Sequence, residues 1–315
     1  MEGSPSDVEQ PAGPSEQPAS VVALHALGTD VDLHVTGHAA PELAAQLRDR
    51  WHLALRPAAA GAAPGTAADV TPDVAPDVTP DAASGPAPET VVVRAHRLAP
   101  EETPPPWTRG ERTVADSDPR RLLQHLTQAV THAVITARTG DLLMLHAAAL
   151  ADPVTGATAV FVAPGNTGKT TLCRTLGPTR TYVSDETVGI RRDGGVTPYL
   201  KPLSTRRPDW AGVKDEQAPG QVGLRAPVAE PWVAGIVVLR RDAEHAGPVE
   251  LEPLDTLDAV VALTPESSGF MRTDGPLRWL ADVLERTGGA RRATYAEVSG
   301  LEPLAAEICA RRSPW

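Results

Sequence analysis

The chain has 315 residues, enough for one large domain or two ordinary ones, which excludes a peptide or a disulfide-stapled miniprotein. Its 40 Asp and Glu against 29 Lys and Arg give a net charge of -11. The sequence lacks the dense basic stripe that binds nucleic acid or an anionic membrane, so we expect neither as a partner. Two cysteines without metal-ligand spacing exclude a disulfide framework and a structural zinc site. Because no signal-like N-terminus or membrane-length apolar run occurs, we expect a cytoplasmic protein.

The first predicted elements belong to a small α+β N-terminal lobe over residues 21–117. Residues 1–20 precede it with the composition of a disordered tail. Alternating apolar residues predict paired strands with a turn at residues 28–30, and four-residue spacing of Leu and Trp predicts a helix that Pro41 opens. The predicted strands are residues 21–24, 31–35 and 91–94, and the predicted helix is residues 41–55.

A Pro- and Ala-rich insertion over residues 58–90 interrupts this lobe. Its four-residue repeat places a proline at every fourth position from Pro72 to Pro80, which forbids a continuous helix or a central strand. We therefore expect an extended, disordered spacer, with a docking motif as the alternative.

The second predicted domain covers residues 118–315 and opens with a long helix over residues 118–139. Two short apolar runs, residues 142–150 and 157–162, then predict buried strands. The second run leads into a glycine-containing loop and a helix around residues 172–176. We therefore expect an α/β fold whose core carries a phosphate-binding loop, with the α+β lobe beside it.

The loop that follows the second strand fits the phosphate-binding (P-loop) pattern except at Ala163, where the pattern has glycine. Glycines allow backbone N–H groups to turn toward phosphate oxygens, Lys169 would reach the outer phosphates, and the Thr170 hydroxyl would bind Mg²⁺. With only three lysines in the chain, a chance Gly-Lys-Thr in a turn is the weaker alternative. The predicted nucleotide-binding residues are Gly165, Asn166, Thr167, Gly168, Lys169, Thr170 and Thr171.

Two adjacent acids, Asp185 and Glu186, lie on a predicted strand over residues 181–190. Adjacent strand residues point to opposite faces, so both can face a phosphate only if the strand ends there. One acid could take a proton from an attacking hydroxyl while the other binds the metal, and a solvated strand end is the alternative. Because Asn166 is the only asparagine, the guanine-reading motif of GTPases and the catalytic-loop asparagine of protein kinases are both absent.

Together, the strand that carries His146, the phosphate loop and the acid pair resemble the catalytic core of the bacterial HPr serine kinase/phosphorylase family over residues 142–190. The resemblance implies that His146 supports a catalytic aspartate, that Asp185 is this base, and that Glu186 lies on the metal side. For His146, a satisfied core histidine is the alternative. The glycine-rich stretch that follows the acid pair in the full HPr enzymes has no counterpart, so the chain looks more like their stand-alone relatives, some of which phosphorylate peptides.

These features predict an HPr kinase-like phosphotransferase that uses ATP and Mg²⁺, with Thr170 and Glu186 as metal ligands. The expected acceptor is a hydroxyl, a Ser or Thr of a peptide or small protein. A non-catalytic nucleotide-binding sensor or assembly module and a small-metabolite kinase share the same motifs and stay open.

Overall fold

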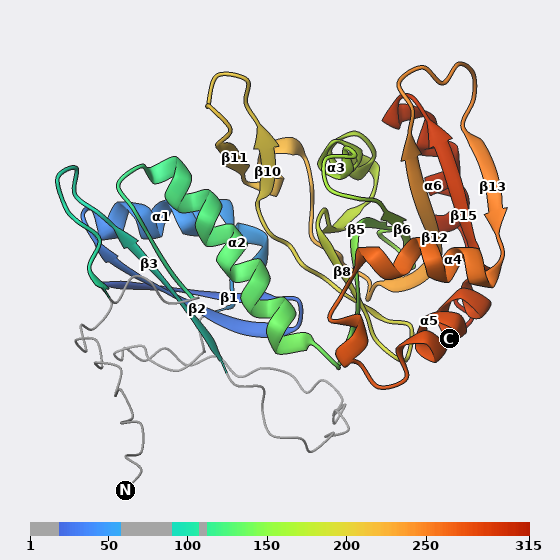
Figure 1. Cartoon of the computed structure of the whole chain (residues 1–315), viewed down its shortest axis with the longest axis horizontal. Helices are drawn as coiled ribbons and strands as arrows, with labels where there is room; N and C mark the ends of the chain where they lie inside the picture. The colour runs from blue at the N-terminus through green and yellow to red at the C-terminus, as the bar shows by residue number, and fades with distance from the viewer. Residues whose placement is uncertain (1–18, 58–89, 107–111) are drawn as a thin grey trace, which may run out of the picture.

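The computed structural model of the chain describes residues 19–57, 90–106 and 112–315. Nearly all of the predicted tail and of the predicted Pro-rich insertion lies outside the described residues. Within them the fold is mixed α/β, with two sheets and a separate hairpin of two strands (Figure 1). No helix in these described ranges is long and apolar enough to cross a bilayer.

The N-terminal sheet has four strands, the first pair antiparallel and the rest parallel. In order they are β1 (Ser20–Ala26), β2 (Thr29–Gly37), β3 (Val91–Arg97) and β4 (Thr113–Asp116). Every second residue of β2 is buried, so one face of the sheet is apolar. Helices α1 (Ala40–Arg50) and α2 (Pro119–Arg138) bury their apolar side chains in the same core as that face.

Two local predictions need correction. The hairpin turn consists of Leu27 and Gly28, both with positive φ, because a two-residue turn of this hand matches the strand twist. The helix predicted to reach residue 55 ends at Arg50. Leu55 instead forms a β-bridge with Leu24, so the chain turns back to the sheet although its apolar spacing still fits a helix.

Helix α2 confirms the predicted helix to within one residue at each end, and the Asp118 carboxylate accepts the backbone N–H of Arg120 as its N-cap. Its buried residues Leu122, Leu126 and Val130 share a core with the N-terminal sheet. The predicted boundary at residue 118 therefore separates this helix from the sheet on which it packs.

The central sheet has nine strands, of which β6, β12 and β15 run parallel and the others join antiparallel. The order along it is β13 (Glu250–Leu254), β15 (Ala290–Tyr295), β12 (Trp232–Arg241), β6 (Ala157–Val162), β5 (Leu143–Ala151), β8 (Thr187–Ile190) and β9 (Val196–Thr197). β7 (Thr181–Ser184) and β14 (Ser267–Ser268) also pair with β5.

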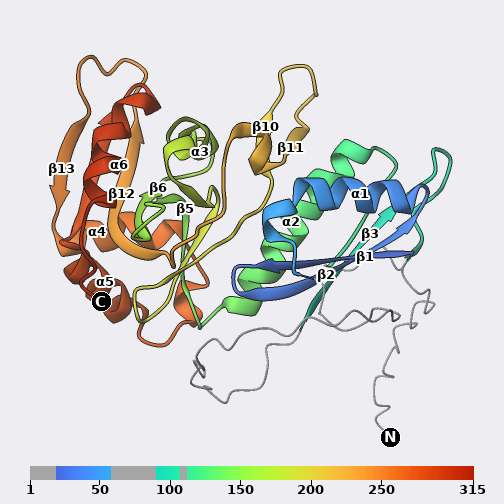
Figure 2. The same ribbon diagram turned by 180° about the vertical axis from the view of Figure 1, so that it is seen from behind.

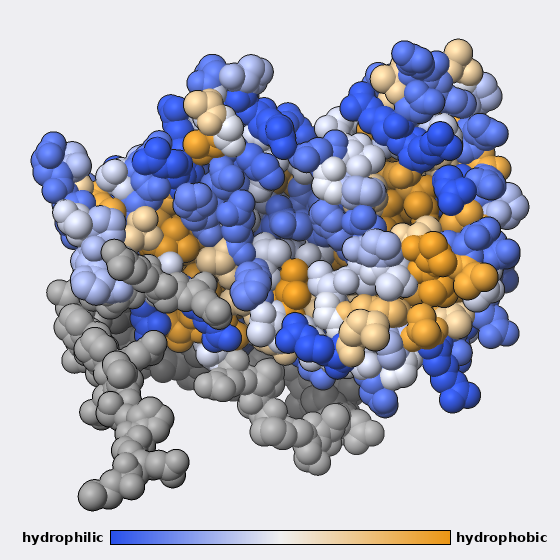
Figure 3. Space-filling view, viewed as in Figure 1, coloured by the Kyte–Doolittle hydropathy of each residue, from blue (hydrophilic) through white to orange (hydrophobic). Residues whose placement is uncertain are grey.

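Helices pack on both faces of the central sheet because its middle strands are buried on both sides. In β6, Phe161 shares a core with α3 (Lys169–Leu176) and α6 (Glu302–Cys309). Its neighbours Val160 and Val162 share the opposite core with α4 (Thr256–Leu263) and α5 (Pro276–Thr287). The space-filling view shows hydrophobic side chains gathered over α4, where Leu257 and Val261 are exposed (Figure 3).

The hairpin of β10 (Leu203–Arg206) and β11 (Lys214–Gln217) lies between α2 and α3 in both ribbon views (Figures 1 and 2). The backbone N–H of Lys214 donates to Gln124 Oε1 of α2 at 2.7 Å. The hairpin therefore connects the helical layer of the N-terminal sheet to the helix that follows the glycine-containing loop.

Candidate functional site

The loop between β6 and α3 has the strand–loop–helix context that the sequence predicts. Gly168 has φ +97° and Asn166 has φ +67°, in the left-handed region where glycine and asparagine are tolerated best. Ala163 has no positive φ and is buried, so this position does not require the glycine of the usual pattern. No side chain of the described residues caps α3, which leaves its first N–H groups to an anion.

Lys169 is buried at the start of α3, and its Nζ donates to the carbonyl oxygens of Ala163 and, at 2.9 Å, of Pro164. Burial lowers the pKa of Lys169 to about 8, against the opposing effect of Glu266 and Asp185. A buried ammonium group held only by carbonyl oxygens would gain from a nearby anion.

The predicted strand over residues 181–190 is broken at the acid pair. Ser184 Oγ accepts the backbone N–H groups of both Glu186 and Thr187 at 3.1 Å, which stabilises a turn between β7 and β8. The turn removes the alternation that would send adjacent side chains to opposite faces. Asp185 and Glu186 therefore reach the same cation, Lys201.

Lys201 Nζ lies 3.0 Å from Asp185 Oδ1 and 3.1 Å from Glu186 Oε2. The side chains of Lys201 and Asp185 are each only 2% exposed, whereas that of Glu186 is 35% exposed. Burial alone would lower the pKa of Lys201, but the two acids outweigh it and raise this pKa above its ordinary value. Lys201 is not among the site residues predicted from the sequence, and the rarity of lysine in the chain is the one signal that points to it.

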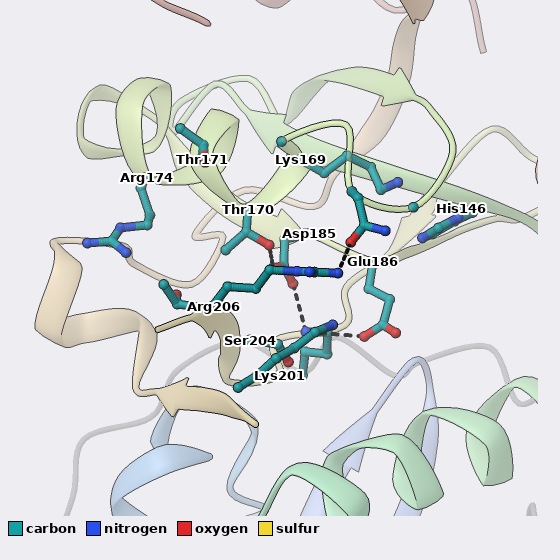
Figure 4. A pocket seen from close by; sticks show the side chains of 15 residues that line it. His146, Lys169, Thr170, Thr171, Arg174, Asp185, Glu186, Lys201, Ser204 and Arg206 are labelled. Carbon is teal, nitrogen blue, oxygen red and sulfur yellow. Dashed lines mark hydrogen bonds and ion pairs between the residues drawn. The ribbon is translucent and has the colours of Figure 1, made fainter. Parts of the chain in front are cut away.

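Asp185 has two further partners. Tyr182 donates its hydroxyl to Asp185 Oδ1 at 3.0 Å. Thr170 donates its hydroxyl to Asp185 Oδ2 at 2.7 Å (Figure 4). The second contact joins the acid pair to the first turn of α3. Oxygen atoms from a hydroxyl and a carboxylate are the ligands that Mg²⁺ prefers. The described residues contain no cluster of three or more His, Cys, Asp or Glu that could hold a metal ion by itself.

His146 lies on β5 at the edge of the same pocket, but its partner differs from the one that the resemblance implies. Its Nδ1 is 3.2 Å from Glu266 Oε2, whereas the side-chain contacts of Asp185 are with Tyr182, Thr170 and Lys201. Burial, and then the charge of Lys169, lower the pKa of His146, which favours the neutral imidazole. The ring of His146 is therefore held by Glu266 in this structure, and its support of Asp185 stays a prediction.

Cations from the hairpin and α3 complete the pocket, which has a volume of about 910 Å³. Arg206 Nη2 donates to Asn166 Oδ1 on the loop at 2.7 Å, and Arg174 Nη1 donates to Gln217 Oε1 at 3.3 Å. Of the seven predicted loop residues, all but Thr167 line the pocket, and Thr167 donates to the Pro164 carbonyl oxygen instead. The lining residues outside the set predicted from the sequence are Arg174, Lys201, Ser204, Thr205, Arg206 and Lys214.

Comparison with protein-family models and with curated proteins found no match. Among solved structures, the chain is similar to the HPr(Ser) kinase/phosphatase from Coxiella burnetii, at 12% sequence identity and a TM-score of 0.28. The alignment covers 52% of this chain and 92% of that one. A likeness of this size establishes neither family nor function.

Proposed function

We propose that the protein is an ATP- and Mg²⁺-dependent kinase that transfers the γ-phosphoryl group to a hydroxyl, with a Ser or Thr of a peptide or small protein as the expected acceptor. One observation carries this proposal. Thr170 donates to Asp185, and Lys201 pairs with both Asp185 and Glu186. All of these side chains line one pocket with Lys169. Phosphoryl transfer needs mainly positioning and charge neutralisation, and this set of groups can supply both.

The pocket offers hydrogen-bond donors for the phosphates of a nucleotide and oxygen ligands for its metal. The loop N–H groups and Lys169 would bind the outer phosphates of ATP, and the Thr170 hydroxyl with a carboxylate of the acid pair would hold Mg²⁺. When bound, Mg²⁺ would neutralise charge on the phosphoryl group that is transferred. Lys201 holds both carboxylates in place, since each accepts from the same buried ammonium group.

The contacts of the acid pair favour a division of roles opposite to the one that the resemblance implies. Asp185 is buried and already bonded to Thr170, the predicted metal ligand, so it fits the metal side. Glu186 is more exposed and can be reached by an acceptor, so it fits the general base that takes the hydroxyl proton. The acceptor oxygen then forms its bond to the γ-phosphorus as the bond to the β-phosphate oxygen breaks and ADP leaves.

The test is transfer of labelled phosphate from [γ-³²P]ATP with Mg²⁺ to pools of Ser- and Thr-containing peptides and of small hydroxyl compounds. We expect a labelled product with the wild type and none with Lys169→Ala. Arg207→Gln is the matched control, because Arg207 pairs with Asp215 and does not line the pocket. A wild-type protein that binds ATP yet labels no acceptor would contradict the kinase and favour a nucleotide-binding sensor or assembly module.

A further inference from the structure

Three cations of the pocket form no ion pair within the part of the chain that the structure describes. Arg206 and Arg174 donate to the neutral amide oxygens of Asn166 and Gln217. Together with Lys214 they line one pocket, and no carboxylate within the described residues forms an ion pair with any of the three. In a chain with a net charge of -11, acidic partners are abundant, so three unpaired cations at one place indicate a site for an external anion.

The hairpin register strengthens this point. Arg206 on β10 lies directly opposite Lys214 on β11 in the antiparallel pair. Like charges directly opposite each other destabilise a strand pair unless a counter-charge lies between them. The next residue, Arg207, has such a counter-charge on the same hairpin, because Asp215 Oδ2 lies 2.8 Å from its Nη2. The hairpin therefore neutralises its outward arginine and leaves the pocket-lining pair without an acid.

The outer phosphates of a nucleotide already have partners in the proposed site, namely the loop N–H groups and Lys169. Arg206 reaches the pocket from the hairpin rather than from the loop (Figure 4), and Lys214 comes from the same hairpin. A second anion beside the transferred phosphoryl group would be neutralised by these side chains. Arginine binds carboxylate and phosphate oxygens through charge-assisted hydrogen bonds.

We propose that Arg174, Arg206 and Lys214 form an acceptor-anion site, which binds a carboxylate or phosphate group carried by the acceptor close to the hydroxyl that is phosphorylated. This inference rests on the proposed function. It specifies that the acceptor carries an anionic group in addition to the hydroxyl. The overall negative charge of the chain would favour a neutral or basic acceptor, so the local cations and the net charge make opposite predictions.

The binding test loads the full-length protein with a non-hydrolysable ATP analogue and Mg²⁺, then titrates inorganic phosphate as the probe. Side-chain ¹⁵Nε signals of arginine report the second anion. We expect saturable shifts of the Arg206 and Arg174 signals in the analogue-loaded protein. Arg206→Gln should weaken phosphate binding by about tenfold or more, the size expected for loss of a charged hydrogen bond. It should weaken binding of the analogue less than binding of phosphate, and the control Arg207→Gln should change both affinities by less than about twofold.

Three results would overturn the acceptor-anion site: no shift with phosphate, a shift only when the analogue is absent, or a larger loss of analogue affinity than of phosphate affinity in Arg206→Gln. The last two would assign these cations to the nucleotide. If the analogue does not bind the wild type, the proposed function fails and the inference falls with it. If the analogue binds and phosphate does not, only the inference fails.

Two sets of acceptors distinguish the sources of the anion. One set compares Ser peptides that differ only by Asp or Asn beside the serine, and the other compares glycerol 3-phosphate with glycerol. Preference for Asp would identify a peptide carboxylate, and preference for glycerol 3-phosphate would identify a small phosphorylated alcohol. Preference for the neutral member in both sets would overturn the inference.

Discussion

Two clusters in this molecule have the same composition, one cation between two carboxylates, in different surroundings. In the N-terminal sheet Arg56 lies 2.7 Å from both Asp30 and Asp32, and all three side chains are about one-third exposed. In the pocket Lys201 bridges Asp185 and Glu186 at 3.0 and 3.1 Å, with Lys201 and Asp185 only 2% exposed. Water screens the first cluster and is excluded from most of the second.

The difference shows which of the two clusters has a function beyond holding the fold. Surface ion pairs contribute little because water already solvates their charges. Burying the charges of Lys201 and Asp185 costs free energy that their attraction only partly offsets, so such a pair is a poor way to stabilise a fold. A buried cluster that is retained beside a phosphate-binding motif is therefore a candidate for chemistry.

The largest expected effect is on stability, when the cation of each cluster is removed. Lys201→Met leaves Asp185 buried without its cation and should lower the free energy of unfolding by about 3–5 kcal/mol. Arg56→Met removes the cation of the exposed cluster and should lower it by no more than about 1 kcal/mol. Urea unfolding of both variants checks the difference. Equal losses would mean that burial does not distinguish the two clusters.

The second prediction separates the two acids of the pocket. Glu186→Gln should reduce phosphoryl transfer by at least about 10²-fold without changing the Mg²⁺ requirement, because a general base contributes a factor of this size. Asp185→Asn should raise the Mg²⁺ concentration needed for nucleotide binding. Steady-state rates and Mg²⁺ titrations of both variants distinguish the general base from the metal ligand. The reverse pattern would support Asp185 as the base, as the sequence predicts.

Glu216 gives the third prediction, a dependence of the free energy of unfolding on pH. Burial raises the pKa of Glu216 to about 7, although Lys201 and Ser204 oppose this. The folded protein thus keeps a proton that the unfolded chain releases near its ordinary pKa of 4.5, so stability falls as pH rises from about 4.5 to 7.

Glu216→Gln should remove this loss and be more stable than the wild type by about 3 kcal/mol at pH 8, with little advantage at pH 4.5. Urea unfolding across this pH range measures the difference between the two proteins. A constant difference at all pH values would contradict the raised pKa.

The smallest effect is a proton taken up when nucleotide binds. At pH 8 about half of the Lys169 side chains should be neutral, because burial lowers their pKa to about 8. Phosphate oxygens nearby would raise that pKa, so ATP binding should draw roughly half a proton onto Lys169. Calorimetry in buffers of different ionisation enthalpy measures the uptake. Lys169→Arg, whose side chain is always charged, should show none, and equal uptake in both would assign the proton to another group.

The local parts of the fold could be predicted from the sequence, because alternation in β1 and β2 and the strand–loop–helix order depend on neighbouring residues. The break at Asp185 could not, because it depends on a turn that Ser184 stabilises inside an apolar segment. Contacts between distant segments were also missed. Glu266 lies 120 positions from His146 and Arg206 lies 40 from Asn166, and no periodic pattern links residues so far apart.

The central claim, that the loop at Lys169 binds a nucleotide with its metal, is tested most directly by calorimetric titration of ATP into wild type and Lys169→Ala, with and without Mg²⁺. The account predicts Mg²⁺-dependent binding to the wild type that is lost in the variant. Binding that is equal in both proteins, or absent from the wild type, would contradict it.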